Sequence, residues 1–258
     1  MSNRKNERGF TLVELSIVLV IIGLIVGGVL AGQSLINSAK LQAEVTQFNK
    51  IDTAVNAFYL KFNGLPGDMA NSSGFTTAGV ANGNADGYIG GTAGVGAGGA
   101  VADITTYTST EEANAAAELF ELGLLPGTAV NPTGTSASAI STSGGDVLIG
   151  KALIGSGILL FGNAAVSANN NWAFYGIQNA STSAVKVEDL YGSDQVLSID
   201  SKMDDGIATT GLVQSRDNAN NDLLTVGVTG CNSAAGAGGG IYTAKTTAVC
   251  AFMIRLSQ

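Results

Sequence analysis

The sequence predicts an α+β fold, in which one long N-terminal α-helix precedes a domain that contains strands. The helix is predicted from an apolar run over 10–30 and from apolar residues that recur every three or four positions as far as Phe62. The strands are predicted from segments rich in Val, Ile, Leu and aromatic residues at 146–161, 171–178, 212–214 and 248–256. With 258 residues, 45% hydrophobic and 12% charged, the chain is long enough for one membrane helix and one further domain.

The apolar run contains only three polar residues, Thr11, Glu14 and Ser16. As a helix its 21 residues would extend about 31 Å, enough to cross a bilayer core of roughly 30 Å. A carboxylate inserted there costs about 2.5–3.5 kcal/mol. Glu14 therefore requires either a function or a partner.

A short basic leader precedes this run, with Arg4, Lys5 and Arg8 against Glu7. A secretory signal peptide would have an apolar centre of only 7–15 residues and a small-residue cleavage site, and this run is longer, with no clear Ala-x-Ala site. A plain membrane anchor explains everything except Glu14 and the junction of Gly9 with Phe10.

A third interpretation rests on 9–14, Gly-Phe-Thr-Leu-Val-Glu, followed by the long apolar segment. This arrangement resembles the processing site of type IV prepilins and pseudopilins, and the resemblance is most specific over 9–31. It implies that a membrane-embedded prepilin peptidase cleaves after Gly9 and then N-methylates Phe10. It also implies that Glu14 pairs with the terminal amine of a neighbouring subunit, which would offset its desolvation. The alternative is a tolerated carboxylate that snorkels near the start of the helix.

The same resemblance implies a pilin-like fold, with an antiparallel sheet packed on the second half of the helix. It implies a structural subunit of a type IV pilus or type II secretion pseudopilus, assembled from copies of itself and other pilins by inner-membrane machinery. A minor or tip subunit that acts as an adhesin is the alternative. The chain would wait in the bacterial inner membrane and then lie in a filament in the periplasm or at the cell surface. The basic leader orients the N-terminus to the cytoplasm and the domain outward.

Beyond the membrane segment the helix is predicted to continue as an amphipathic helix over 32–63. One face holds Leu41, Val45, Phe48, Ile51, Val55, Phe58 and Phe62, and the polar positions include Lys40, Glu44, Lys50 and Asp52. Asn63-Gly64 followed by Pro66 predicts its end. The chain thus divides into a removed leader (1–9), a transmembrane and polymerisation helix (10–31), its amphipathic continuation (32–63) and an outward-facing globular domain (64–258).

Glycines recur at a spacing of four in the membrane half, as Gly23 and Gly27 and as Gly28 and Gly32. Small residues at this spacing allow helices to approach closely in an apolar medium. We therefore predict that these glycines serve helix packing.

Two groups of oxygen-bearing residues are candidates for weak calcium binding. Asn82, Asn84 and Asp86, with glycine at position 6, match the first part of a calcium loop, but Ala93 stands where the bidentate glutamate is needed. An intact loop is therefore excluded, which leaves either a weak site completed by Asp68 or another carboxylate, or a turn without metal. The second, lower-ranked group comprises Asp200, Asp204 and Asp205.

This second group lies at the end of a short helix predicted within 187–206, and some major pseudopilins bind calcium through an acidic loop late in the domain. The spacing alone indicates only a solvated acidic helix end. A further helix is predicted over 109–123 from its capping residues, its early glutamates and its alanines. Trp172, Phe174 and Tyr175 are predicted to pack in the domain, with a ligand platform as the alternative.

The two cysteines, Cys231 and Cys250, lie late in the chain. An outward-facing domain lies in an oxidising compartment, where paired cysteines usually form a disulfide, and many pilins have one in this region. The alternative is two free thiols in a reducing compartment.

Composition also restricts the function. The chain contains no histidine, which removes the commonest general base and the usual zinc ligand, and it shows no nucleophile motif, so we expect no enzyme activity. We expect no cofactor other than calcium. The net charge of −8 becomes −10 without the leader, whose three basic residues outnumber its one acidic residue, so we expect no direct nucleic-acid binding.

Overall fold

The computed structural model describes the following residues: 11–72, 74–75, 82–90, 111–126, 148–149, 157–162, 171–181, 184–187, 190–216, 231, 240–242 and 248–257. The chain forms two compact units, 1–40 and 41–258, and each is described by itself. Gly9, Phe10 and Ala93 lie outside the described residues.

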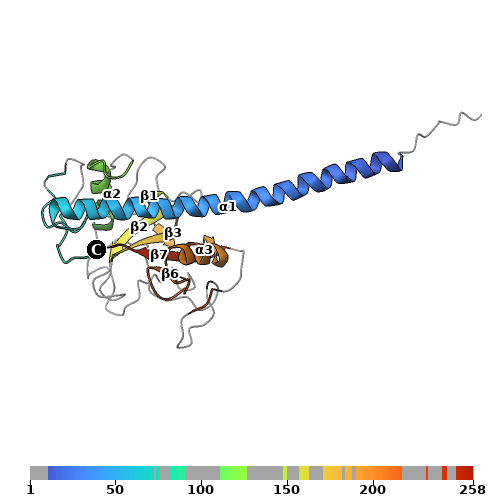
Figure 1. Cartoon of the computed structure of the whole chain (residues 1–258). Helices are drawn as coiled ribbons and strands as arrows, with labels where there is room; N and C mark the ends of the chain where they lie inside the picture. The colour runs from blue at the N-terminus through green and yellow to red at the C-terminus, as the bar shows by residue number, and fades with distance from the viewer. Residues whose placement is uncertain are drawn as a thin grey trace, which may run out of the picture. The chain divides into compact units, whose positions relative to one another are not determined.

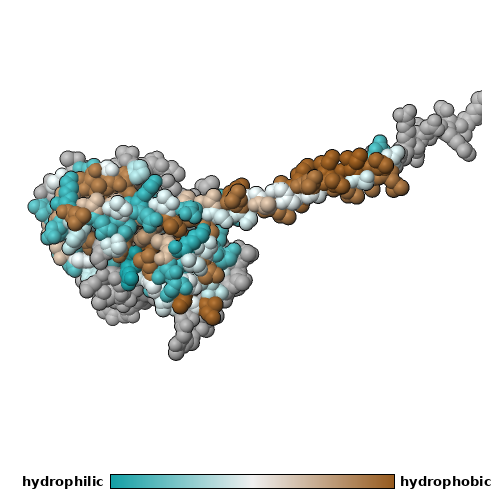
Figure 2. All heavy atoms as spheres, in the orientation of Figure 1, coloured by the Kyte–Doolittle hydropathy of each residue, from teal (hydrophilic) through white to brown (hydrophobic). Residues whose placement is uncertain are grey.

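Helix α1 (Leu12–Phe62) is continuous, as the sequence predicts (Figure 1). In the first unit, every large apolar side chain from Leu12 to Leu30 is at least 50% exposed, and Figure 2 shows a continuous apolar surface there. Among the described residues, α1 is the one helix that is long and apolar enough to cross a membrane. Such a surface requires either lipid or other helices around it.

The part of α1 that belongs to the second unit buries one face. Its buried apolar residues follow the helical spacing and are Leu41, Phe48, Ile51, Ala54, Val55 and Phe58. Glu44 departs from the prediction, because the helical pattern assigns it to the polar face and it is only 1% exposed. It is accommodated in the core because the Tyr191 hydroxyl donates a hydrogen bond of 3.2 Å to Glu44 Oε1.

Helix α1 ends where the sequence predicts. Asn63 adopts the left-handed conformation with a φ of 53°, and its N–H donates to the Tyr59 carbonyl. The turn that follows contains Gly67, whose φ is 84°. A Cβ at Gly67 would collide with the Glu111 carbonyl, so glycine allows this turn to pack against the start of α2 (Glu111–Glu121).

The domain contains one antiparallel sheet with the order β1-β2-β3-β7-β5, with β4 paired to β3 and β6 paired to β7. The strands are β1 (Leu148–Ile149), β2 (Gly157–Gly162), β3 (Asn171–Ser181), β4 (Ala184–Val187), β5 (Tyr191–Gly192), β6 (Val213–Arg216) and β7 (Ala248–Arg255). Together with α1 this is the α+β fold that the sequence predicts, with the second half of the helix in the same hydrophobic core as the sheet.

The strand predictions at 171–178, 212–214 and 248–256 are confirmed in β3, β6 and β7. The segment 146–161 is not one strand, because β1 and β2 pair antiparallel with each other. In the sequence, glycines at 150 and 155 interrupt the apolar run, and glycine weakens the interior of a strand. The short strands β4 and β5 were not predicted.

Aromatic residues of the sheet form the centre of the core. Tyr175 of β3 stacks on Phe252 of β7 with ring centroids 4.6 Å apart, and Tyr191 meets Phe252 edge-on at 4.9 Å. Trp172 and Tyr175 are at most 1% exposed, so they pack in the domain and do not form a ligand platform. Helices α2 and α3 (Ser193–Met203) confirm the two short helices that the sequence predicts.

Candidate functional site

The first turn of α1 is capped by reciprocal hydrogen bonds between Thr11 and Glu14. The Thr11 N–H and hydroxyl both donate to Glu14 Oε2, at 2.8 and 3.0 Å, and the Glu14 N–H donates to Thr11 Oγ1 at 3.3 Å. This is a capping box, which stabilises the first turn of a helix by satisfying N–H groups that have no partner in the helix. The pattern Thr-x-x-Glu was visible in the sequence and was not used. Glu14 therefore has a partner within its own chain as well as its predicted role between chains.

The four glycines of the membrane half have no contact within the chain that requires them. A Cβ placed on Gly23, Gly27, Gly28 or Gly32 would meet nothing within 4 Å. Their predicted role in packing against other helices stays a prediction.

In the domain, the loop 82–90 is built around carboxylates. The Asp68 side chain accepts the N–H groups of Asp86 and Gly87, each at 3.0 Å, and its carbonyl accepts the N–H of Ala85 at 2.8 Å. Glu111 accepts the N–H groups of Asn84 and Gly90, each at 2.9 Å.

The remaining N–H groups of this loop are also used. The Gly83 N–H donates to the Met69 carbonyl, the Tyr88 N–H to Asp86 Oδ1 and the Ile89 N–H to Asn171 Oδ1. All eight backbone N–H groups from Gly83 to Gly90 thus donate to acceptors within the domain. Most of these acceptors are carboxylate and carbonyl oxygens of other segments, so the hydrogen bonds make the loop rigid.

The three calcium candidates of this loop accept or donate hydrogen bonds in the described structure. Asn82 Oδ1 accepts the N–H and hydroxyl of Ser72, both at 2.9 Å. Asn84 and Asp86 lie together, since Asn84 Nδ2 donates to Asp86 Oδ2 at 3.0 Å and Asn84 Oδ1 accepts the Asp86 N–H at 2.9 Å. These bonds explain the loop as a turn, and calcium binding here stays a prediction.

The second-rank candidates do converge. One oxygen from each of Asp200, Asp204 and Asp205 lies within 4.8 Å of the others. Asp200 is buried and accepts hydrogen bonds from the Tyr242 hydroxyl at 2.8 Å and from the Gly206 N–H at 3.2 Å. Burial, with smaller contributions from the two neighbouring aspartates, raises the pKa of Asp200 to about 6. Carboxylate oxygens of this kind are ligands that suit calcium.

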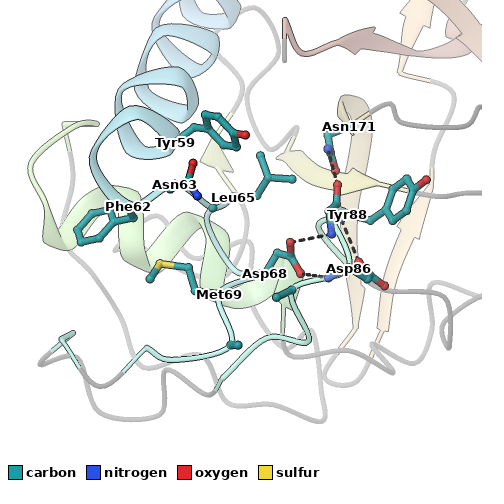
Figure 3. A pocket seen from close by; sticks show the side chains of 13 residues that line it. Tyr59, Phe62, Asn63, Leu65, Asp68, Met69, Asp86, Tyr88 and Asn171 are labelled. Atoms are coloured by element: carbon teal, nitrogen blue, oxygen red, sulfur yellow. Dashed lines mark hydrogen bonds between the residues drawn. The ribbon is translucent and has the colours of Figure 1, made fainter.

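A cavity of about 540 Å³ lies at the end of α1, next to the loop 82–90 (Figure 3). Its lining combines aromatic and apolar side chains with two carboxylates: Tyr59, Phe62, Asn63, Leu65, Asp68, Met69, Asp86, Tyr88 and Asn171. Figure 3 shows Tyr59 and Tyr88 coming from different segments, with Leu65 and Asp68 between them in this view. The sequence did not reveal this cavity, because its walls come from segments more than a hundred residues apart.

A buried carboxylate of α2 supports the turn after α1. Glu118 is 0% exposed, and its Oε2 accepts the Gly67 N–H at 2.7 Å while Oε1 has no hydrogen-bond partner. Burial raises the pKa of Glu118 to about 7, and Glu121 adds to this shift. Burial also raises the pKa values of Asp68 and Glu111.

These shifts predict that stability falls as the pH rises from about 4 to about 7. In the unfolded chain Glu118 and Asp200 have their ordinary pKa values of 4.5 and 3.8, so they have already released their protons in this interval. The folded state still keeps these protons. Glu118 alone should account for about 3 kcal/mol at most. Denaturant unfolding at pH 4.5 and pH 8 measures the difference. Glu118→Gln keeps an acceptor for Gly67 and should reduce the pH dependence; an unchanged profile would contradict the assignment.

The disulfide between Cys231 and Cys250 is present, as predicted, and both cysteines are fully buried. Their Cα atoms are 5.1 Å apart. Cys250 lies in β7 and pairs across the ladder with Tyr191 of β5. The bond therefore ties residue 231 to a strand inside the sheet.

Comparison with known proteins identifies the N-terminal segment. Residues 4–30 match the family model described as the prokaryotic N-terminal methylation motif, the signature of type IV prepilins and pseudopilins. No curated protein and no solved structure matches the chain. The match confirms the resemblance seen in 9–14, and it covers residues 4–9 of the predicted leader, the predicted cleavage junction and the first part of α1.

Proposed function

We propose that the chain is a structural subunit of a type IV pilus or type II secretion pseudopilus. One observation carries this proposal. The methylation motif over 4–30 coincides with a helical segment whose apolar side chains from Leu12 to Leu30 are all at least half exposed. A helix of this kind is stable in a membrane and can move from there into a bundle of like helices, where its side chains are again buried.

In this proposal, cleavage between Gly9 and Phe10 removes the leader and creates a new amine close to the capping box of α1. Glu14 then pairs with the Phe10 amine of a neighbouring subunit. A carboxylate is costly to place in the membrane, and an ammonium beside it favours its charged form. The pair would therefore offset that cost upon assembly.

The partners follow from the same proposal. A prepilin peptidase and methyltransferase processes the chain, and inner-membrane machinery assembles it with copies of itself and other pilins. The chain is held in the inner membrane before assembly and in the filament afterwards. A minor or tip subunit is the second candidate, and abundance separates the two, because a major subunit dominates sheared filaments.

The processing step is tested with Gly9→Val. The wild-type chain should appear in sheared filaments with residues 1–9 removed and Phe10 methylated, as measured by electron microscopy and mass spectrometry. Gly9→Val should stay uncut and absent from filaments, because a branched side chain replaces the glycine at the junction. Gly23→Ala is the matched control and should be cut normally. Normal cleavage of Gly9→Val would contradict the proposal.

Calcium binding at Asp200, Asp204 and Asp205 stays a prediction, and it can be tested independently of assembly. Calcium at millimolar concentration should raise the midpoint of thermal unfolding, because a divalent cation relieves the repulsion among three converging carboxylates. Asp204→Asn should abolish this shift, whereas Asp194→Asn on the same helix should not. An equal shift in both variants would exclude this cluster as the site.

A further inference from the structure

The cavity at the end of α1 has no role in the assembly proposed above, and its chemistry selects a particular kind of ligand. We propose that it binds a primary ammonium group on an apolar stem, such as a lysine side chain of a partner protein or a free alkyl polyamine. The inference does not depend on filament formation.

The charge of the lining favours a cation. Among the residues that the structure describes, the cavity lining includes two carboxylates, Asp68 and Asp86, and no lysine or arginine. The whole chain carries a net charge of −8 and contains no histidine. Such a field repels anionic ligands and concentrates cations.

The loop 82–90 presents a carboxylate to the cavity. The eight backbone N–H groups from Gly83 to Gly90 already donate to acceptors within the domain, so none of these eight is left to bind an acceptor on a ligand. What the loop does offer is the exposed carboxylate of Asp86, whose oxygens each have a further lone pair. An ammonium has three donors and no acceptor, so it can donate to the Asp86 carboxylate and pair with its charge.

The aromatic residues provide the rest of the site. Tyr59 is 45% exposed, and Phe62 and Tyr88 are partly exposed beside it. Aromatic faces attract cations and also cover an aliphatic stem. The chain itself shows this attraction, because Lys61 Nζ lies 5.1 Å from the centroid of the Phe62 ring.

The site is also largely prearranged. Asp86 is held by the Tyr88 N–H and by Asn84 Nδ2, each at 3.0 Å, so little order has to be gained when a ligand arrives. A cavity of about 540 Å³ is within the usual size of small-ligand sites and exceeds what one alkylammonium requires.

The test measures binding of Nα-acetyl-lysine methylamide to the full chain in non-ionic detergent micelles, by isothermal titration calorimetry at low and high salt. We expect saturable binding that weakens with salt, and at least tenfold weaker binding of the Nε-acetylated probe, which lacks the charge. Cadaverine distinguishes the two sources: tighter binding of the lysine probe indicates a peptide partner, and tighter binding of cadaverine a free polyamine. N-acetylglucosamine should not compete.

Three substitutions locate the site. Asp86→Asn should weaken lysine-probe binding at least tenfold, and Tyr59→Ala, which leaves the loop intact, should weaken it severalfold. Lys61→Gln should strengthen binding, because it removes a competing ammonium from the Phe62 ring. Asp194→Asn on α3 is the matched control and should have no effect. Equal binding of the charged and Nε-acetylated probes, or binding of N-acetylglucosamine in place of the amine, would overturn the proposal.

Discussion

Replacing Glu14 with glutamine is expected to abolish filaments while leaving the start of α1 intact. Glutamine can still accept the Thr11 N–H and hydroxyl in the capping box, which the structure shows for Glu14 Oε2. It cannot form the charge pair with the amine of a neighbouring Phe10. Because this pair would form only between subunits, its loss should lower the amount of subunit in filaments by at least about tenfold.

The comparison with two other variants separates the roles of Glu14. Glu14→Ala removes both the charge and the cap and should also fail to assemble. Thr11→Val keeps the charge and removes the hydroxyl, so it should lose about 1 kcal/mol at the start of the helix and still assemble. The measurement is the amount of subunit in sheared filaments, relative to the amount of cleaved subunit in the membrane. If Glu14→Gln assembles normally while Thr11→Val and Glu14→Ala fail, Glu14 acts through capping and the intermolecular pair is wrong.

Removing the disulfide is expected to lower the free energy of unfolding of the domain by about 3 kcal/mol, within a range of 2–5 kcal/mol. The bond links residues 19 positions apart and connects Cys231 to Cys250 of β7. Replacing both Cys231 and Cys250 with serine also places two hydroxyls in fully buried positions, so paired replacement by alanine is the better variant. Denaturant unfolding in the presence and absence of a reductant measures the effect.

The double alanine variant also serves as the control for this experiment. A reductant should destabilise the wild-type domain and leave the double alanine variant unchanged, since the variant has no bond to reduce. If reduction leaves the wild-type transition unchanged, the disulfide does not contribute to stability.

The sequence was sufficient for those features that depend on local patterns. The apolar run, the amphipathic spacing and the stop at Asn63-Gly64 with Pro66 predicted α1 to within a few residues, because each signal acts within one or two helical turns. The motif at 9–14 can be recognised for the same reason, since its residues are adjacent in the sequence. The disulfide was predicted from the compartment and from the presence of only two cysteines.

Features that depend on distant residues could not be predicted in this way. Glu44 is polar by any local measure, and its burial depends on Tyr191, which lies 147 positions later. The loop 82–90 has the residue types of a calcium loop, yet its N–H groups point to acceptors such as Asp68, Glu111 and Asn171, which belong to other segments. These bonds to distant residues appear only in the tertiary structure, and calcium binding by Asn82, Asn84 and Asp86 stays a prediction.

The position of β7 has a consequence for the order of events during synthesis. This strand follows all the other described helices and strands in the chain, and it pairs with β3, β5 and β6 in the interior of the sheet. Ser257, just beyond it, also bonds to Asp52 of α1 through its N–H and its hydroxyl. The domain therefore cannot complete its core until β7 has left the ribosome, and the N-terminal helix is available for insertion well before that point. A chain that lacks β7 would lose the centre of the sheet, so we expect it not to form a folded domain.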